Sequence, residues 1–232
     1  GRGGRAADRR AGRGAYVKRA AAALLLCSLS SALPLEAQRA DSIIERTSAV
    51  YRQLRSLTAD FDQVISNEMI GTYKSRGTLA QAGAARLSMR FTDPAGEAIV
   101  IDGTSIWVYT PTTAPGQVVR APVARAAGYG ANLLAWLLDR PSERYRVTLL
   151  RGDIVAGTPV DVLRLMPAVE GLPFTSATLW LARSDGLPRR IEVTEPSGNR
   201  RTLTLSKLQT DVALPPGTFT FTPPKGVKVI DQ

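Results

Sequence analysis

Residues 77–111 read GTLAQAGAARLSMRFTDPAGEAIVIDGTSIWVYTP, and this stretch decides the fold. Leu87, Met89 and Phe91 alternate with polar residues, which is the period of two expected of a strand with one buried face. Asp102-Gly103 then separates two apolar runs, and both residues tolerate a positive φ, as the turn of a β-hairpin requires. The stretch therefore predicts an antiparallel meander whose apolar face must be covered by a second layer or by an apolar ligand.

The charge of the chain is unevenly distributed. The net charge is +10, but residues 1–37 hold seven Lys and Arg against two Asp and Glu, a net of +5, so half of the excess lies in a sixth of the chain. The remaining residues carry 23 basic against 18 acidic side chains and form no strongly basic segment. We therefore expect no binding of nucleic acid.

The N-terminal segment has the pattern of a secretory signal. A basic, Gly/Arg-rich start leads into the apolar run 20–33, which is too short to span a bilayer, and the small residue Ala37 follows. We expect residues 1–37 to be a signal peptide removed after Ala37, and residues 38–232 to form a single exported domain. A short N-terminal anchor is the alternative interpretation.

Several kinds of site chemistry are absent from the predicted mature chain. The sequence has no histidine, and its single cysteine, Cys27, falls in the predicted signal. This composition leaves no thiol nucleophile, His-based triad, disulfide or Cys/His zinc site, and we expect no metal or other cofactor. Asp60 and Asp62 share one face of a predicted strand, and paired carboxylates can perform acid–base chemistry, but a solvated strand face explains them equally well. We expect a protein that is not an enzyme.

Two helices are predicted. Residues 42–57 carry apolar side chains at helical spacing, and Ser42 and Glu45 fit a capping box at its start. Residues 131–139 are apolar on every side, lie between Gly130 and Pro141 and are too short to span a membrane, so they predict a helix buried in a core or against an apolar ligand.

Short strands separated by turn residues make up the rest of the domain. Besides the meander, the predicted strands are 59–65, 73–81, 117–120, 145–151, 160–166, 175–182, 189–194, 200–207 and, at the edge, 218–221. We expect a mainly β (α+β) fold, in which an antiparallel sheet of about eleven strands curls into a half-barrel with helices over its concave face. Two helices give little cover for so many strands, so an apolar pocket for lipid or acyl chains is predicted, with a dry core as an equal alternative.

Several segments together resemble the periplasmic outer-membrane lipoprotein carrier family, LolA. The similar segments are Ala59–Gln63, Gly77–Leu79, Phe91–Pro94, Ile99–Pro111 and Phe219–Gln232, within a resemblance that spans residues 42–232. The family implies an unclosed barrel with a helical lid over an apolar cavity. It also implies a monomeric carrier that takes acylated lipoproteins from an inner-membrane lipoprotein-releasing ABC transporter and passes them to an outer-membrane acceptor.

One feature of the family pattern is missing. Relatives often have an Arg-Pro pair just before the strand of Leu87, and that arginine holds the lid closed, whereas Gly83 and Ala84 stand at the matching positions here. Arg86 is near, but alternation places it on the face opposite Leu87. We therefore expect closure of the lid to depend more on apolar burial than on charge-assisted hydrogen bonds.

These arguments define two sets of candidate site residues. The predicted lining of the cavity is Phe61, Ile65, Leu79, Leu87, Met89, Phe91, Ile99, Ile101, Trp107 and Tyr109. The predicted inner side of the lid is Leu133, Leu134, Trp136 and Leu137. A carrier of this kind, a general lipid carrier and an envelope module that senses lipid or lipoprotein all remain compatible with the sequence, with a carboxylate-based hydrolase ranked far below them.

Overall fold

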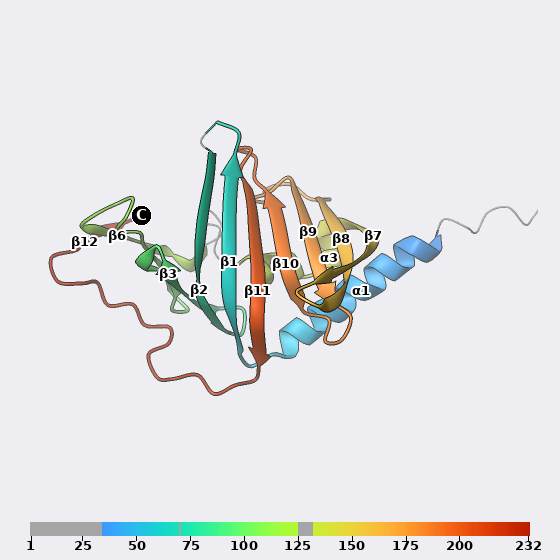
Figure 1. The fold of residues 1–232 in the computed structure, drawn as a ribbon, viewed down its shortest axis with the longest axis horizontal. Coiled ribbons are helices and arrows are strands. Elements are labelled where there is room, and N and C mark those ends of the chain that lie inside the picture. Colours follow the sequence, from blue (N-terminus) through green and yellow to red (C-terminus); the bar gives the residue numbers. More distant parts are fainter. Residues whose placement is uncertain (1–33, 70, 125–131) are drawn as a thin grey trace, which may run out of the picture. The chain divides into compact units, whose positions relative to one another are not determined.

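The computed structural model describes residues 34–69, 71–124 and 132–232. The chain separates into two units, Gly1–Leu35 and Glu36–Gln232. The predicted signal peptide lies almost entirely outside the described residues. All arrangements below concern the second unit, whose ribbon is shown in Figure 1.

The second unit is built on a single mixed sheet of 12 strands in the order β12-β6-β5-β4-β3-β2-β1-β11-β10-β9-β8-β7. The strands are β1 (Leu57–Asn67), β2 (Gly71–Ala82), β3 (Arg86–Asp93), β4 (Ala95–Ile101), β5 (Ser105–Tyr109), β6 (Gln117–Pro122), β7 (Tyr145–Val155), β8 (Thr158–Pro167), β9 (Ser176–Ala182), β10 (Pro188–Thr194), β11 (Arg200–Thr210) and β12 (Lys228–Asp231). Neighbouring strands pair antiparallel, except that β12 runs parallel to β6. Because β12 and β7 end the sheet without pairing with each other among the described residues, the predicted unclosed half-barrel is confirmed.

The predicted hairpin at Asp102-Gly103 is confirmed. The backbone N–H of Asp102 donates to the carbonyl of Ser105 at 3.1 Å, and Gly103 has φ 109°, a conformation that suits glycine. The carboxylate of Asp102 accepts from the N–H groups of Thr104 and Ser105, from the Thr104 hydroxyl and from Trp107 Nε1. Its partial burial acts to raise its pKa, but these hydrogen bonds outweigh that effect and lower the pKa to about 2.

Three helices are described: α1 (Pro34–Gln53), α2 (Leu133–Leu138) and α3 (Pro141–Arg144). The predicted helix 42–57 is correct in kind but wrong at both ends, because α1 begins eight residues earlier and Leu57 opens β1. Ser42 and Glu45 therefore lie inside α1 and do not cap it. Helix α2 is shorter than the predicted helix 131–139, of which residue 131 lies outside the described part.

Helices α1 and α2 pack on the same face of the sheet, which we call the inner face. Ala40, Ile44 and Tyr51 of α1 and Leu134 and Leu137 of α2 belong to one apolar cluster with side chains from the strands. The hydroxyl of Thr47 in α1 donates to the carbonyl of Gly186 at 2.8 Å, which fixes the helix near the β9–β10 turn.

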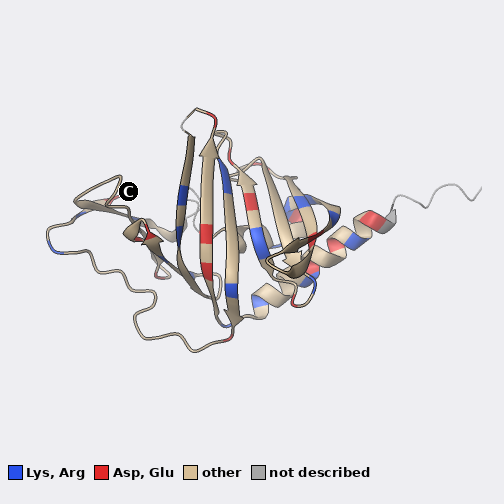
Figure 2. Ribbon diagram, viewed as in Figure 1, with Lys and Arg blue, Asp and Glu red and all other residues tan. Residues whose placement is uncertain are grey.

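The segment 211–227 links β11 to β12 and is drawn in orange-red in Figure 1. It contacts side chains of β3 and β5 on the opposite, outer face of the sheet. Residues 218–221, predicted as the edge strand, are not a strand; the edge strand is β12. The ring of Phe221 lies 5.8 Å from that of Trp107 and 5.7 Å from that of Tyr109, and Arg90 Nη2 donates to the carbonyl of Thr220 at 2.9 Å. Figure 2 shows acidic residues on β1, basic residues on β2 and β11, and both kinds on β10, so charges of opposite sign lie on neighbouring strands.

Candidate functional site

Most of the predicted cavity residues come together on the inner face. Phe61, Leu79, Leu87, Met89, Phe91 and Ile101 are buried in the main apolar cluster, and Ile99 packs against it. The rings of Phe61 and Phe91 meet edge to face at 5.1 Å, which is a favourable geometry for an aromatic pair. The alternation in β3 thus directs Leu87, Met89 and Phe91 to one side, as predicted.

Two predicted lining residues face the other way. In β5, Ile106 and Val108 join the inner cluster, so Trp107 and Tyr109 point to the outer face, where they contact Phe221. This placement corrects the prediction, which chose the larger side chains of β5 for the cavity. Ile65 lies on β1 beyond the main cluster and is half-buried.

Helix α2 fills the inner face in this structure. Leu134, Leu137 and Leu138 are buried, and Leu133 packs against the cluster from its edge. The space left between α2 and the strands is a cavity of about 20 Å³, lined by Leu79, Leu87, Met89 and Leu203 among others. The wall predicted for an apolar ligand is therefore covered by the predicted lid.

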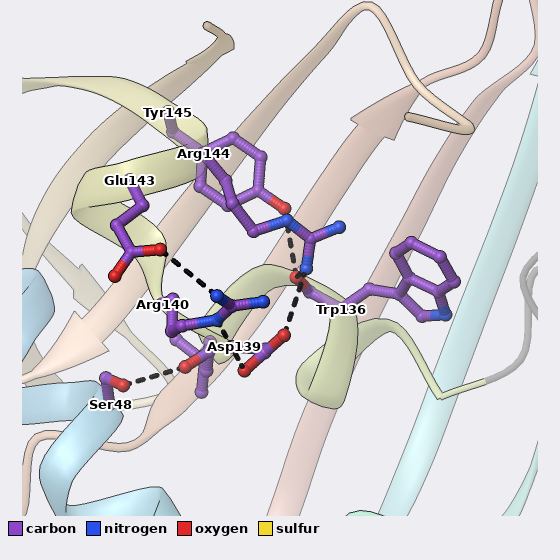
Figure 3. A network of polar contacts seen from close by, with 8 residues as sticks. Ser48, Trp136, Asp139, Arg140, Glu143, Arg144 and Tyr145 are labelled. Carbon is purple, nitrogen blue, oxygen red and sulfur yellow. Dashed lines mark hydrogen bonds and ion pairs between the residues drawn. The ribbon is translucent and has the colours of Figure 1, made fainter. Parts of the chain in front are cut away.

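The C-terminal end of α2 is held by side chains from three elements (Figure 3). Ser48 Oγ of α1 donates to the carbonyl of Leu138 at 2.7 Å, and this contact is fully buried. The hydroxyl of Tyr145 donates to the carbonyl of Trp136 at 2.9 Å, and Arg144 Nη1 donates to the same oxygen at 3.3 Å. These bonds satisfy carbonyls that the end of a short helix leaves without intrahelical partners.

The N-terminal end of α2 is held through Asn132. Its carbonyl accepts from the Trp136 N–H at 3.2 Å, and its Nδ2 donates to the carbonyl of Ala84 at 2.6 Å. Its Oδ1 accepts from Gln81 Nε2 at 3.3 Å. The turn that lacks the family arginine at Gly83 thus meets the lid through its own backbone and through a polar side chain supplied by the lid.

These contacts change the balance of forces expected to hold the predicted lid. The sequence predicts that apolar burial dominates closure, and Leu134 and Leu137 of α2 do have buried side chains. The structure adds neutral hydrogen bonds from Ser48 and Tyr145 and one from the Arg144 guanidinium, at the end of the lid remote from Gly83.

An open groove lies beside α2. Its volume is about 690 Å³, within the range of small-molecule sites. Tyr51, Ile101, Val123, Trp136 and Val169 supply apolar and aromatic surface, and the rim carries Arg52, Arg140, Arg144, Asp139 and Glu143. Trp136 was predicted to line the inner side of the lid, but it borders this groove, where the Arg144 guanidinium lies 5.2 Å from its ring.

Burial shapes the chemistry of two tyrosines near α2. Burial raises the pKa of Tyr51, against a smaller lowering by the hydrogen bond from Gln81. Burial likewise raises the pKa of Tyr145, with a lowering by Arg144 and a further increase from Asp139. Both phenols therefore stay neutral at physiological pH, and Tyr145 remains a hydrogen-bond donor to α2.

Membrane-spanning helices and metal sites are both absent from the part of the chain that the structure describes. The described residues contain no helix long and apolar enough to cross a membrane. Within the same part of the chain, acidic, histidine and cysteine side chains form no group of three or more that could hold a metal ion.

Comparisons with known proteins agree on one family. The family described as outer membrane lipoprotein carrier protein LolA matches residues 52–222. A protein of Alkalilimnicola ehrlichii named outer-membrane lipoprotein carrier protein is 30% identical over 218 residues, which cover 93% of this chain and 96% of the relative. A protein of the same name from Chromobacterium violaceum is 28% identical over 206 residues, covering 89% of this chain and 96% of the relative.

Solved structures show the same fold at lower sequence similarity. An uncharacterized conserved protein from Thermus thermophilus superposes with a TM-score of 0.54 at 14% identity, covering 84% of this chain and 100% of that one. MucB superposes with a TM-score of 0.51 at 22% identity, covering 80% of this chain and 63% of MucB.

Proposed function

The chain belongs to the outer membrane lipoprotein carrier family LolA, and from this premise we propose that it carries acylated lipoproteins across the periplasm. In this proposal the acyl chains bind on the inner face of the half-barrel, between the strands and α2. The carrier receives its cargo from an inner-membrane ABC transporter, delivers it to an outer-membrane acceptor, and catalyses no reaction.

The observation that carries the proposal is an apolar wall covered by a helix too short to be stable alone. Helix α2 has six residues, whereas isolated helices need about 12–15 residues to be even marginally stable in water. Its position depends on the Leu134 and Leu137 contacts and on a few hydrogen bonds at its ends. An acyl chain would offer the same wall an equivalent apolar surface, so cargo and α2 would compete for it.

The groove beside α2 supports an entry path. It borders Ile101 and Leu138, which belong to the main apolar cluster, so a chain lying in the groove would reach the edge of the covered wall. Its charged rim would remain in water, near the polar part of a cargo molecule. Displacement of α2 would then join the groove to the small cavity behind it.

Localisation and processing belong to the same proposal. Removal of residues 1–37 would leave α1 beginning at Gln38, with Ala40, Ile44 and Tyr51 still available to the core. N-terminal sequencing of the exported protein tests this step. A protein that retains residues 1–37 after export would contradict it.

The decisive experiment is mass spectrometry of the protein purified from its own periplasm. We expect acylated lipoprotein to co-purify with it. Free phospholipid instead would favour a general lipid carrier, and the absence of any acylated molecule from a freshly isolated, folded sample would contradict acyl binding. A Leu87→Glu variant on the inner face should lose the cargo, whereas Thr78→Glu, at an exposed position on the outer side of β2, should keep it.

A further inference from the structure

The side chain of Gln81 is buried beneath α2, and its amide nitrogen has hydrogen-bond partners whereas its amide oxygen has none in the described part of the chain. It lies on β2, is 2% exposed, and borders the cavity of about 20 Å³ together with Leu79 and Leu87. Its Nε2 faces three acceptors: the Tyr51 hydroxyl, the Gly83 carbonyl at 2.9 Å and Asn132 Oδ1 at 3.3 Å. Its Oε1 is buried and has no hydrogen-bond partner among the described residues.

The orientation of this amide is fixed by its surroundings. Exchanging the positions of Oε1 and Nε2 would set an oxygen against the Gly83 carbonyl and against Asn132 Oδ1, two contacts between acceptors. The orientation that avoids both contacts leaves Oε1 as the unpaired atom. A buried acceptor without a donor is energetically unfavourable, so in the closed form Oε1 of Gln81 remains an unsatisfied hydrogen-bond acceptor.

Opening of the lid would affect the hydrogen bonding of Nε2 and of Oε1 differently. Asn132 leaves with α2, so Nε2 keeps two acceptors, Tyr51 and Gly83, for its two hydrogens. Oε1 remains in a wall whose apolar side chains, Leu79, Leu87, Met89 and Leu203, offer no donor. The other polar side chain of the wall, Gln63, already donates to Ser75 Oγ and accepts from Arg201. An apolar chain that replaces α2 on this wall therefore meets one polar atom without a partner, Gln81 Oε1, and that atom needs a hydrogen-bond donor.

We propose that Gln81 is a specificity-determining residue that accepts a hydrogen bond from the N–H of an amide-linked acyl chain. An ester-linked chain of the same length has only acceptors at its head and leaves Oε1 unpaired. This inference rests on the proposed binding of acyl chains to the inner face and adds a preference for the amide linkage.

The test compares two probes that differ only in this linkage, N-methylhexadecanamide and methyl hexadecanoate. Each competes with an environment-sensitive fluorescent fatty acid for the purified protein. One additional hydrogen bond predicts a preference for the amide of about two- to tenfold. In Gln81→Met, which keeps the bulk of the side chain without its amide, the ratio of the two affinities should fall to about one.

Matched variants separate recognition from release of the lid. Asn132→Ala removes a lid contact but keeps Gln81, so it should strengthen binding of both probes and preserve their ratio. Leu79→Met changes the same wall without a polar atom and should also preserve the ratio. Gln81→Asn, which withdraws the amide by one methylene, should lose the preference and serves if Gln81→Met does not fold.

The outcomes distinguish the inference from the function on which it rests. Equal affinities for the two probes in the unaltered protein, or a preference that survives in both Gln81 variants, would overturn the role of Gln81 and leave the carrier proposal standing. If neither probe displaces the fluorescent fatty acid and that acid itself does not bind, the carrier proposal and the inference fail together.

Discussion

Replacing Ser48 with alanine should loosen the C-terminal end of α2. Ser48 is fully buried in α1, and its Oγ donates to the Leu138 carbonyl at 2.7 Å. The variant removes one hydroxyl and leaves that carbonyl without this donor. Because α2 spans six residues, its internal hydrogen bonds cannot compensate for a lost anchor.

The magnitude follows from the cost of an unsatisfied buried carbonyl. That cost is about 1–3 kcal/mol, and its lower part applies here because the groove beside Leu138 lets the freed carbonyl turn towards water. We therefore expect about 1–2 kcal/mol, which corresponds to a roughly 5- to 30-fold increase in the population of the open lid. The unaltered Tyr145 and Arg144 contacts to Trp136 should keep α2 on the sheet most of the time.

Amide hydrogen exchange on cargo-free protein measures this opening. Exchange of the amides at 136–139 should accelerate by that factor in Ser48→Ala, while amides of the β4–β5 hairpin should not change. Ser56→Ala is the matched control, because Ser56 Oγ donates to the carbonyl of Val212 at 2.6 Å, on a segment remote from α2. Equal acceleration in the hairpin and in α2 would show that Ser48 supports global stability instead, and unchanged exchange at 136–139 would refute the anchor.

Three further predictions concern the wall, the sheet and the hairpin. Leu87→Glu should reduce binding of an acyl probe at least tenfold, because burying a carboxylate costs several kcal/mol and the side chain would displace α2 in order to reach water. Loss of the fold itself, measured by circular dichroism, would show that Leu87 belongs to a dry core and not to a ligand cavity. Gly77→Ala should lower the free energy of unfolding by about 1–3 kcal/mol or more, because the new Cβ would lie 2.0 Å from the Arg90 carbonyl oxygen. Thr78→Ala is the control, and equal denaturation midpoints for the two variants would contradict the clash. Asp102→Asn should lower the free energy of unfolding by about 1 kcal/mol at neutral pH, after allowance for solvent screening. Because folding lowers the pKa of Asp102 from 3.8 to about 2, this difference in stability should vanish as the pH falls from about 4 to about 2, and a difference that is constant with pH would rule out the carboxylate charge as its source.

The central meander could be predicted because its determinants are local. Alternation through Leu87, Met89 and Phe91 defines a face, and Asp102-Gly103 defines a turn, so neither depends on distant residues. The same local logic is wrong at Gly152, which directly follows the predicted strand 145–151, whereas β7 continues to Val155. Gly152 lies within the strand opposite Asp161, and a Cβ there would sit 2.6 Å from Arg183 Nη2, so the glycine makes room for that guanidinium and forms no turn.

The error at residues 218–221 has a similar origin. Phe219 and Phe221 alternate with threonines as in a strand, but their rings lie against Arg86 and Arg90 on the outer face. Alternation shows that two side chains point the same way. It does not show whether the backbone pairs within a sheet or lies across one, because that depends on the partner.

The polar anchors of the lid could not be derived from sequence patterns at all. Ser48 and Leu138 are separated by 90 residues, and nothing in the neighbourhood of either predicts the hydrogen bond that joins them. The sequence shows only that Gly83 stands where relatives often have an arginine, which predicts that closure of the lid depends more on apolar burial than on charge-assisted hydrogen bonds. The structure supplies polar contacts from α1, α3 and β7 at the opposite end of α2, in addition to those that Asn132 makes near Gly83. The contacts at the Asn132 end are fewer, and there the two hydrogens of Gln81 Nε2 are shared among three acceptors, so we expect α2 to open from its Asn132 end first.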